Sequence, residues 1–237
     1  MNARGQSNVV GVALLLGVAV VSMGALTAAV GVVVESSAGE ADAERVATDL
    51  DSALQPVAAT GPHRGRVTFS EGRLGPVDRN LEIRESGSGT VLERVAVDAL
   101  VYESGDRRVA FLAGGIVRGG PEQAWVEAPP PITVDDDVLV VGAPRLGDEV
   151  GSVGGSGGVT ATIETDVSHD RRPLGDGEFA IALETSTPSA WERAFEGMGA
   201  TVTRESGDPP TVVATFDGER TGYLVVHDLE TEVSGGG

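Results

Sequence analysis

The order of hydrophobic and polar positions divides the chain into an apolar run, an amphipathic stretch and a long alternating region. The run from Val9 to Val34 contains no charged side chain. As an α-helix it would be about 39 Å long, because each residue adds about 1.5 Å. A hydrocarbon core of about 30 Å needs about 20 apolar residues. The pattern therefore predicts a transmembrane span over residues 9–34.

Helical character is expected to continue beyond this span. Val46, Leu50 and Leu54 lie at i, i+4 and i+8, which is the spacing of one helix face. Pro56 ends the pattern, since proline disfavours further helix. We therefore expect one long N-terminal helix over residues 6–56, with its first half in the membrane and its second half amphipathic outside.

From Gly65 the pattern changes to short β runs separated by Gly, Pro and Asp, and their spacing favours a sandwich or a partly closed barrel. Thr187-Pro188 begins a short helix, 188–198, with Trp191 and Phe195 on one face. The predicted class is α+β, a long helix followed by a β-rich head. The expected strands are 66–70, 80–84, 91–95, 99–103, 108–112, 116–118, 124–127, 138–141, 159–166, 178–185, 200–204, 211–216 and 222–233.

The β-rich part divides by composition. A β-rich head region is expected over 60–150, and a second β-rich region, which contains the short helix, over 159–233. The Gly/Ser-rich stretch 151–158 between them has the composition of a flexible connector. It could join two domains or form a long hairpin loop. Residues 234–237 are expected to be a flexible tail.

Charge is distributed unevenly. The formal net charge is -19, and the first 38 residues carry only Arg4 and Glu35, so the negative charge lies on the body that follows. Such a surface repels phosphate backbones and disfavours a nucleic-acid partner. All 17 basic side chains are arginine. Together with the many acidic residues this suggests a protein that works in concentrated salt, where surface repulsion is screened; an acidic surface chosen for solubility is the alternative.

Arg4 also gives an orientation, since positive charge favours the cytoplasmic side of a span. The sequence thus predicts a single-pass protein at the cell membrane, with a cytoplasmic N-terminus and an extracellular acidic body. A secretory signal cleaved after Ala38 is the competing interpretation, but the apolar run is longer than such signals need.

The search for reactive chemistry finds no catalytic, cofactor-binding or metal site. No cysteine is present, which excludes disulfides and thiolate chemistry. His63, His169 and His227 have no partner at metal-ligand spacing, and the His-Asp pairs at 169–170 and 227–228 are expected by chance in so acidic a chain. The acidic runs 135–137 and 176–178 do not fit a calcium loop and are interpreted as solvated turns. The sequence therefore predicts no enzyme activity.

The N-terminus carries a family resemblance. The stretch Arg4-Gly5-Gln6-Ser7-Asn8-Val9-Val10-Gly11, which leads into the apolar run, resembles the class III signal peptide of archaeal type IV pilins and archaellins. The resemblance implies that a prepilin peptidase cuts between Gly5 and Gln6, so that residues 1–5 are a leader and the helix is kept. Bacterial pilins carry a glutamate where this chain has Val10. The whole chain also resembles a haloarchaeal pilin-like family of uncharacterised role.

Small residues recur along the apolar run. Gly17, Gly24 and Gly31 lie seven residues apart, and Ala13/Gly17 and Gly24/Ala28 are small-xxx-small pairs. Small residues let helices approach closely, so this pattern favours a helix that packs against copies of itself. The alternative is that Gly and Ala are simply common in membrane helices.

These features lead to one functional hypothesis with two competitors. We expect a membrane-anchored, type IV pilin-like subunit that packs through its N-terminal helix into a surface filament or its assembly base. Its expected partners are the membrane, a prepilin peptidase and itself or other pilin-like subunits. The first alternative is a single-pass anchored extracellular binding protein that does not polymerise. The second is an exported enzyme of unrecognised type.

Overall fold

The computed structural model describes the backbone of residues 3–54, 60–148 and 150–236, and their side chains except those of 3–13, 28–37 and 236. The chain forms two compact units, Met1–Ala41 and Asp42–Gly237. We call the second the β unit, and we describe each unit by itself.

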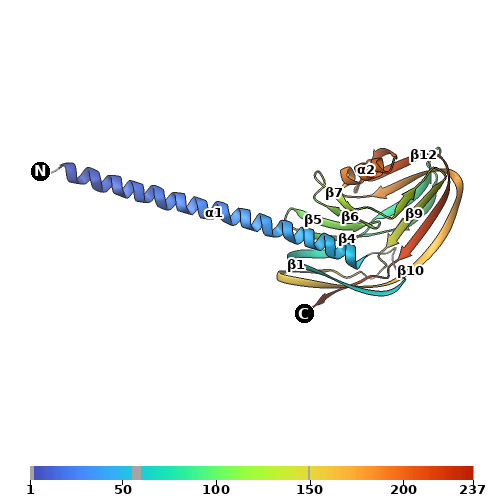
Figure 1. The fold of residues 1–237 in the computed structure, drawn as a ribbon, viewed down its shortest axis with the longest axis horizontal. Coiled ribbons are helices and arrows are strands. Elements are labelled where there is room, and N and C mark those ends of the chain that lie inside the picture. Colours follow the sequence, from blue (N-terminus) through green and yellow to red (C-terminus); the bar gives the residue numbers. More distant parts are fainter. Residues whose placement is uncertain (1–2, 55–59, 149, 237) are drawn as a thin grey trace. The chain divides into compact units, whose positions relative to one another are not determined.

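The elements follow one another in an order dominated by strands (Figure 1). They are α1 (Ala3–Ala53), β1 (Gly61–Val77), β2 (Asn80–Glu85), β3 (Val91–Ala96), β4 (Ala99–Ser104), β5 (Arg107–Leu112), β6 (Gly115–Arg118), β7 (Trp125–Ala128), β8 (Ile132–Val134), β9 (Val138–Arg145), β10 (Val153–Glu184), α2 (Pro188–Gly197), β11 (Thr201–Glu205), β12 (Thr211–Asp228) and β13 (Glu232–Gly236).

Strand β10 organises the β unit because it takes part in two sheets. Its first half pairs with β1 from Val153 to Val167, and its second half pairs with β12 from Ser168 to Glu184. The first sheet continues from β1 through β4, β5 and β6 to β7, and β13 joins it on β10. The second contains β2, β3, β8, β9, β11 and β12, with β9 parallel to β12. The long curved strands β10 and β12 are seen in Figure 1.

Strands β4 and β5 are buried on both faces, and their alternation divides the interior into two cores. Ala99 and Val101 face the core shared with the second sheet, whereas Leu100 and Tyr102 face the core that includes the end of α1. A strand covered on both faces carries a nearly continuous apolar sequence, as Ala-Leu-Val-Tyr in β4 does. The β unit is therefore layered, with the end of α1 on the first sheet and the second sheet on its other side.

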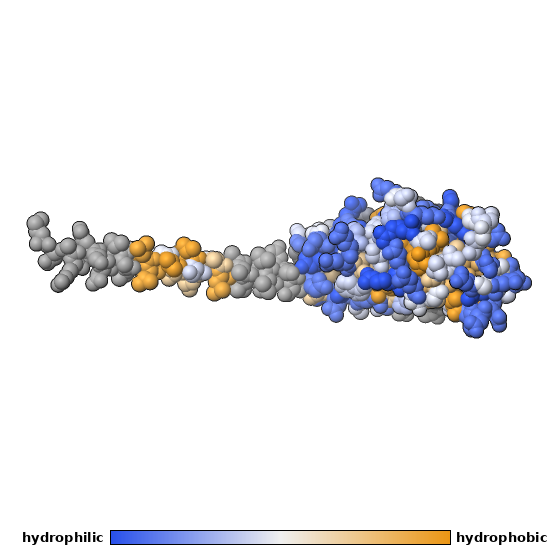
Figure 2. Space-filling view, turned by 90° about the horizontal axis from the view of Figure 1, so that it is seen from above, coloured by the Kyte–Doolittle hydropathy of each residue, from blue (hydrophilic) through white to orange (hydrophobic). Residues whose placement is uncertain are grey.

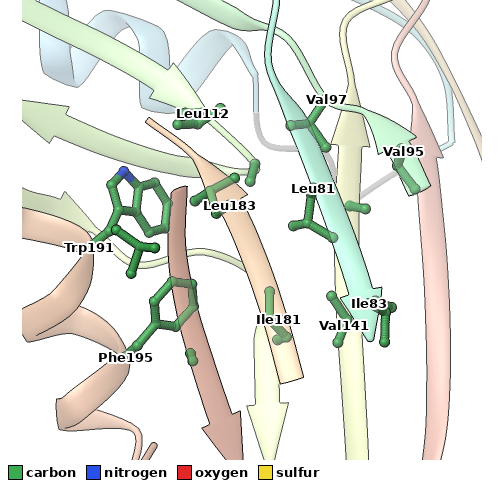
Figure 3. Close-up of a cluster of buried hydrophobic side chains, with 14 of the residues drawn as sticks. Leu81, Ile83, Val95, Val97, Leu112, Val141, Ile181, Leu183, Trp191 and Phe195 are labelled. Atoms are coloured by element: carbon green, nitrogen blue, oxygen red, sulfur yellow. The ribbon is translucent and has the colours of Figure 1, made fainter. Parts of the chain in front are cut away.

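The first core holds the two large aromatic side chains of α2. Trp191 and Phe195 are fully buried, and their ring centroids lie 5.7 Å apart. Figure 3 shows both rings directed toward strand β10, which carries Ile181 and Leu183. These two positions are one helical turn apart and so share one face of α2.

The second core is closed by the last turns of α1. Val46, Leu50 and Leu54 are 0–2% exposed, so the i, i+4, i+8 pattern marks the buried face. Carboxylates on the same stretch bind the strand below: Asp42 accepts a hydrogen bond from the Ser70 N–H at 2.8 Å, and Asp49 accepts one from the Thr68 N–H at 3.1 Å. Thr68 and Ser70 lie in the part of β1 that does not pair with β4. The two carboxylates therefore accept from N–H groups on a strand edge that would otherwise be open.

The α+β class predicted from the sequence is wrong: the residues that the structure describes are mostly β, with 13 strands in their sheet network. The sequence was also misinterpreted at the glycines of the stretch 151–158. Residues 153–158 of the expected connector lie in β10, where Gly155 pairs with Gly72 of β1. A Cβ on Gly154 would lie 3.0 Å from the Gly72 carbonyl oxygen, so glycine at this position permits close packing of the two strands. The two expected β regions consequently share one strand and one compact unit.

The membrane prediction is also corrected. Within the part of the chain that the structure describes, no helix is both long enough and apolar enough to cross a membrane. This finding overturns the expected transmembrane span 9–34, the membrane-embedded half of the helix and the single-pass placement at the cell membrane. Residues 9–13 and 28–34 of that expected span have side chains outside the described set.

Candidate functional site

The first candidate region is the described apolar part of α1, residues 14–27, which we call the apolar segment. Its large side chains are 63–73% exposed; they are Leu14, Leu15, Leu16, Val18, Val20, Val21, Met23 and Leu26. Figure 2 shows these hydrophobic side chains, and it also shows that the visible face of the β unit is mostly hydrophilic. The Thr27 hydroxyl donates to the Met23 carbonyl at 2.9 Å, so it too is satisfied within the helix. What the segment offers a partner is therefore mainly apolar contact, with few free hydrogen-bonding groups.

The glycines of this segment leave room for a neighbour. A Cβ built on Gly17 or Gly24 would meet no atom within 4 Å. The other residues expected to pack, Ala13, Ala28 and Gly31, have side chains outside the described set, as do the expected processing residues Arg4, Gly5 and Gln6. The packing and processing roles remain predictions.

The second candidate region begins with a histidine pair that the strand register creates. His169 of β10 lies opposite His227 of β12, and their Nδ1 atoms are 2.8 Å apart. The two rings meet edge to face at 83°, with centroids 4.8 Å apart. One Nδ1 must donate and the other accept, so the pair keeps its hydrogen bond only while at least one ring is neutral.

Burial decides which ring stays neutral. His227 is 4% exposed, and the loss of solvation, together with the charge of His169, lowers the pKa of His227 to about 4. His227 is therefore neutral at pH 7 and can accept from the His169 N–H. His63, the third histidine, is exposed on β1 and takes no part in this pair.

Beside this pair lies an open hollow of about 290 Å³, which we call the arginine hollow. Three guanidinium groups line it, those of Arg94, Arg145 and Arg172, together with His169. They come from β3, β9 and β10, so the fold brings together residues that are far apart in the sequence. The remaining lining residues are Val95, Ala96, Ser168, Asp170, Val226 and Asp228.

Carboxylates hold each of these arginines in place. Arg172 donates to Asp170 at 2.8 Å and to Glu93 at 3.1 Å, and these hydrogen bonds raise its pKa above the ordinary value. The pKa of Arg145 is likewise raised, chiefly by its hydrogen bond to Asp228. Arg94 donates its Nε–H to Glu82 at 2.7 Å. The guanidinium groups are thus permanently charged and oriented.

Some polar atoms at this place are left over. Arg145 Nε and Asp228 Oδ1 are both buried, and neither has a hydrogen-bond partner among the described residues. Each buried polar atom without a hydrogen-bond partner lowers the stability of the fold by about 1–3 kcal/mol, so such atoms are uncommon in folded proteins. Both residues also line a second, larger hollow of about 520 Å³, whose other polar residues include Asp148, Glu230, Thr231 and Glu232. We call it the acidic hollow.

The acidic runs considered from the sequence do not form a metal site in the described chain, where no group of three His, Asp or Glu side chains lies close enough together to hold an ion. Asp135 Oδ1 instead accepts the neighbouring Asp136 N–H at 2.8 Å, and Asp176 accepts the Thr221 hydroxyl at 2.7 Å. Asp135 thus stabilises the turn between β8 and β9, whereas Asp176 links β10 to β12.

Sequence reasoning missed the histidine pair and the arginine hollow. The available signal was the repeated His-Asp dipeptide at 169–170 and 227–228, which we interpreted as chance. Antiparallel pairing places Ser168 opposite Asp228 and His169 opposite His227, so both dipeptides meet at one point of the sheet.

Comparison with known proteins places the chain in a family. The model of a family of unknown function (DUF7289) matches residues 4–232, so the chain belongs to that family. The matched range includes residues of both compact units. Neither the curated proteins nor the solved structures give a significant match.

Proposed function

We propose that this member of DUF7289 is a pilin-like structural subunit, which assembles with copies of itself or with other pilin-like subunits by packing their N-terminal helices side by side. The β unit is the part of each subunit that such an assembly displays. The observation that carries the proposal is the apolar segment, whose eight large side chains are 63–73% exposed.

An apolar surface of this kind gains stability when another surface covers it. Burial of a Leu, Val or Met side chain contributes about 1.5–3 kcal/mol, and an uncharged helix offers no hydrogen bonds or ion pairs to choose a polar partner. Helix copies are suitable occupants because Gly17 and Gly24, each without a neighbour within 4 Å of a Cβ, let two helices approach closely.

The proposal includes the processing step implied by the N-terminal sequence. A prepilin peptidase would cut between Gly5 and Gln6, after Arg4, and leave the apolar segment in the mature chain. Mass spectrometry of the native N-terminus tests this step, and we expect a mature protein that begins at Gln6. An intact Met1, or a chain that begins at Gly39 without the apolar segment, contradicts it.

Assembly is tested by substitution at the close-approach position. We expect Gly24→Leu to reduce assembly at least about tenfold, because a Leu side chain keeps two helices apart. Gly24→Ala should retain most of it. Sedimentation velocity and electron microscopy in concentrated salt measure the size and form of the assemblies.

A matched control lies in the β unit. A Cβ on Gly87 also meets no atom within 4 Å, so Gly87→Leu adds the same side chain at an open position and should assemble as the unchanged chain does. If Gly24→Leu assembles normally, or Gly87→Leu fails equally, helix packing does not drive assembly.

A binding role for the β unit, without assembly through the helix, is a second candidate function. It is favoured by the arginine hollow, where charged groups from three strands meet at an open depression. Substitutions distinguish the two candidate functions, because assembly depends on the apolar segment and ligand binding depends on Arg94 and Arg172.

A further inference from the structure

We propose that the arginine hollow binds an anionic ligand of monosaccharide size, such as a uronic acid, and holds its carboxylate with Arg94 and Arg172. This inference goes beyond the subunit role and does not depend on it. It rests on the arrangement of donors, acceptors and apolar groups around the hollow.

The guanidinium groups have donors to spare. Each guanidinium has five N–H donors, and the carboxylates that hold Arg94 and Arg172 use only some of them. The side chains of Arg94 and Arg172 are 63% and 44% exposed, so the remaining donors are within reach of a ligand. Because their orientation is already fixed, little side-chain entropy is lost when an anion binds.

Arginines gather at this hollow although the protein as a whole is acidic. The formal net charge is -19, and the three arginines of the lining are held by Asp170 and Asp228 of the lining and by Glu82 and Glu93. Guanidinium groups bind carboxylates and sulfates with paired, charge-assisted hydrogen bonds.

The rest of the lining suits a small polyol rather than a bare ion. Val95, Ala96 and Val226 provide apolar surface for the C–H face of a sugar ring, and Ser168 and Asp170 provide partners for hydroxyl groups. The volume of about 290 Å³ lies at the lower end of ligand pockets, which span about 300–1,000 Å³. That volume exceeds what a single sulfate or carboxylate fills.

Calorimetry with the full chain tests the proposal with glucuronate, glucose and glucosamine as probes. We expect glucuronate to bind, and glucose and glucosamine to bind at least about tenfold more weakly, since they lack the carboxylate that two arginines would hold. An oligosaccharide that contains glucuronate forms a further arm. If both the monomer and the oligosaccharide bind, the site accepts glucuronate either as a free sugar or as part of a glycan. If only the oligosaccharide binds, the ligand is a glycan.

Variants locate the site. Arg94→Gln and Arg172→Gln should each weaken glucuronate binding about tenfold, and Arg172→Lys, which keeps the charge but loses the planar pair of donors, should weaken it less. Arg204→Gln is the matched control, because Arg204 is also held by a carboxylate, Glu192, but lies outside the hollow. Equal binding of glucose and glucuronate, no binding of glucuronate in either form, or equal loss with Arg204→Gln would overturn the proposal.

Discussion

The apolar segment and the β unit treat hydrophobic side chains in opposite ways. In the apolar segment the large side chains are 63–73% exposed, whereas Trp191, Phe195 and Leu50 of the β unit are 0% exposed. The β unit covers its own hydrophobic residues with two sheets, α2 and the end of α1. The segment leaves its large side chains exposed, and under the proposed function a neighbouring helix would cover them.

The charges differ in the same way. The apolar segment carries none, while the β unit holds its arginines in carboxylate pairs, such as Arg204 with Glu192 and Arg145 with Asp228. Exposed pairs contribute only about 0–1 kcal/mol each, so they orient side chains more than they stabilise the fold. Helix α1 thus changes character along its length, from an exposed apolar surface to a layer of a folded unit.

The largest expected effect comes from a test that removes one large hydrophobic side chain from each region. Trp191→Ala should lower the free energy of unfolding of the β unit by about 3–5 kcal/mol, as large-to-small changes at fully buried aromatic residues do. Leu16→Ala should change it by less than about 0.5 kcal/mol, because Leu16 is 64% exposed. Urea denaturation followed by circular dichroism, at a protein concentration too low for assembly, measures both.

Trp125→Ala is the control for the loss of an indole, since Trp125 is 41% exposed and contacts the Arg118 guanidinium at 4.9 Å. It should cost less than about 1 kcal/mol. The comparison fails if Leu16→Ala destabilises the unassembled chain as much as Trp191→Ala does.

A smaller effect is expected from the buried imidazole of the β unit. The pKa of His227 is lowered from 6.5 to about 4 by burial and by His169. Between these two values the unfolded state binds more protons than the folded state, so stability rises with pH across that window. We expect the free energy of unfolding to fall by about 2 kcal/mol between pH 7 and pH 4.5 on account of this residue.

Carboxylates also titrate at the acidic end, so the informative quantity is a difference between variants. His227→Gln should remove the His227 contribution, while His63→Gln, at an exposed position, should retain the full pH dependence. Urea denaturation at several pH values provides the measurement. An unchanged pH dependence in His227→Gln would show that His227 is not a buried neutral imidazole.

Local pattern was sufficient for much of the fold. The runs expected at 80–84, 91–95, 99–103 and 108–112 coincide with β2, β3, β4 and β5 to within two residues, because alternation and turn residues are local properties of the chain. The buried face of 46–54 followed from helix periodicity for the same reason.

The failures involve pairings between distant residues. The stretch 167–177 contains Pro173, Gly175 and Gly177 and favours a turn by composition, but pairing with β12 keeps it extended within β10. His169 and His227 are 58 residues apart in sequence, and their contact depends on a strand register that no local rule provides. The arginine hollow combines residues of three strands that are far apart in the sequence, so it could not be derived from spacing.

The smallest effect concerns the junction at which α1 joins the β unit. Burial raises the pKa of Asp42, but hydrogen bonds from Ser70 and Arg45 and the charge of Arg45 outweigh it, so the net pKa is lowered. The carboxylate therefore stabilises the fold above its unfolded pKa near 3.9, and this contribution is lost as pH falls through the lower folded value.

Asp42→Ala should cost about 1–2 kcal/mol at pH 7, since it removes the acceptor of the Ser70 N–H. Asp49→Ala, which loses the exposed and longer bond to Thr68, should cost less. Urea denaturation of both variants tests whether the carboxylates of residues 42–53 contribute to the stability of the β unit. If Asp42→Ala costs no more than an exposed substitution, that end of α1 contributes only its apolar face.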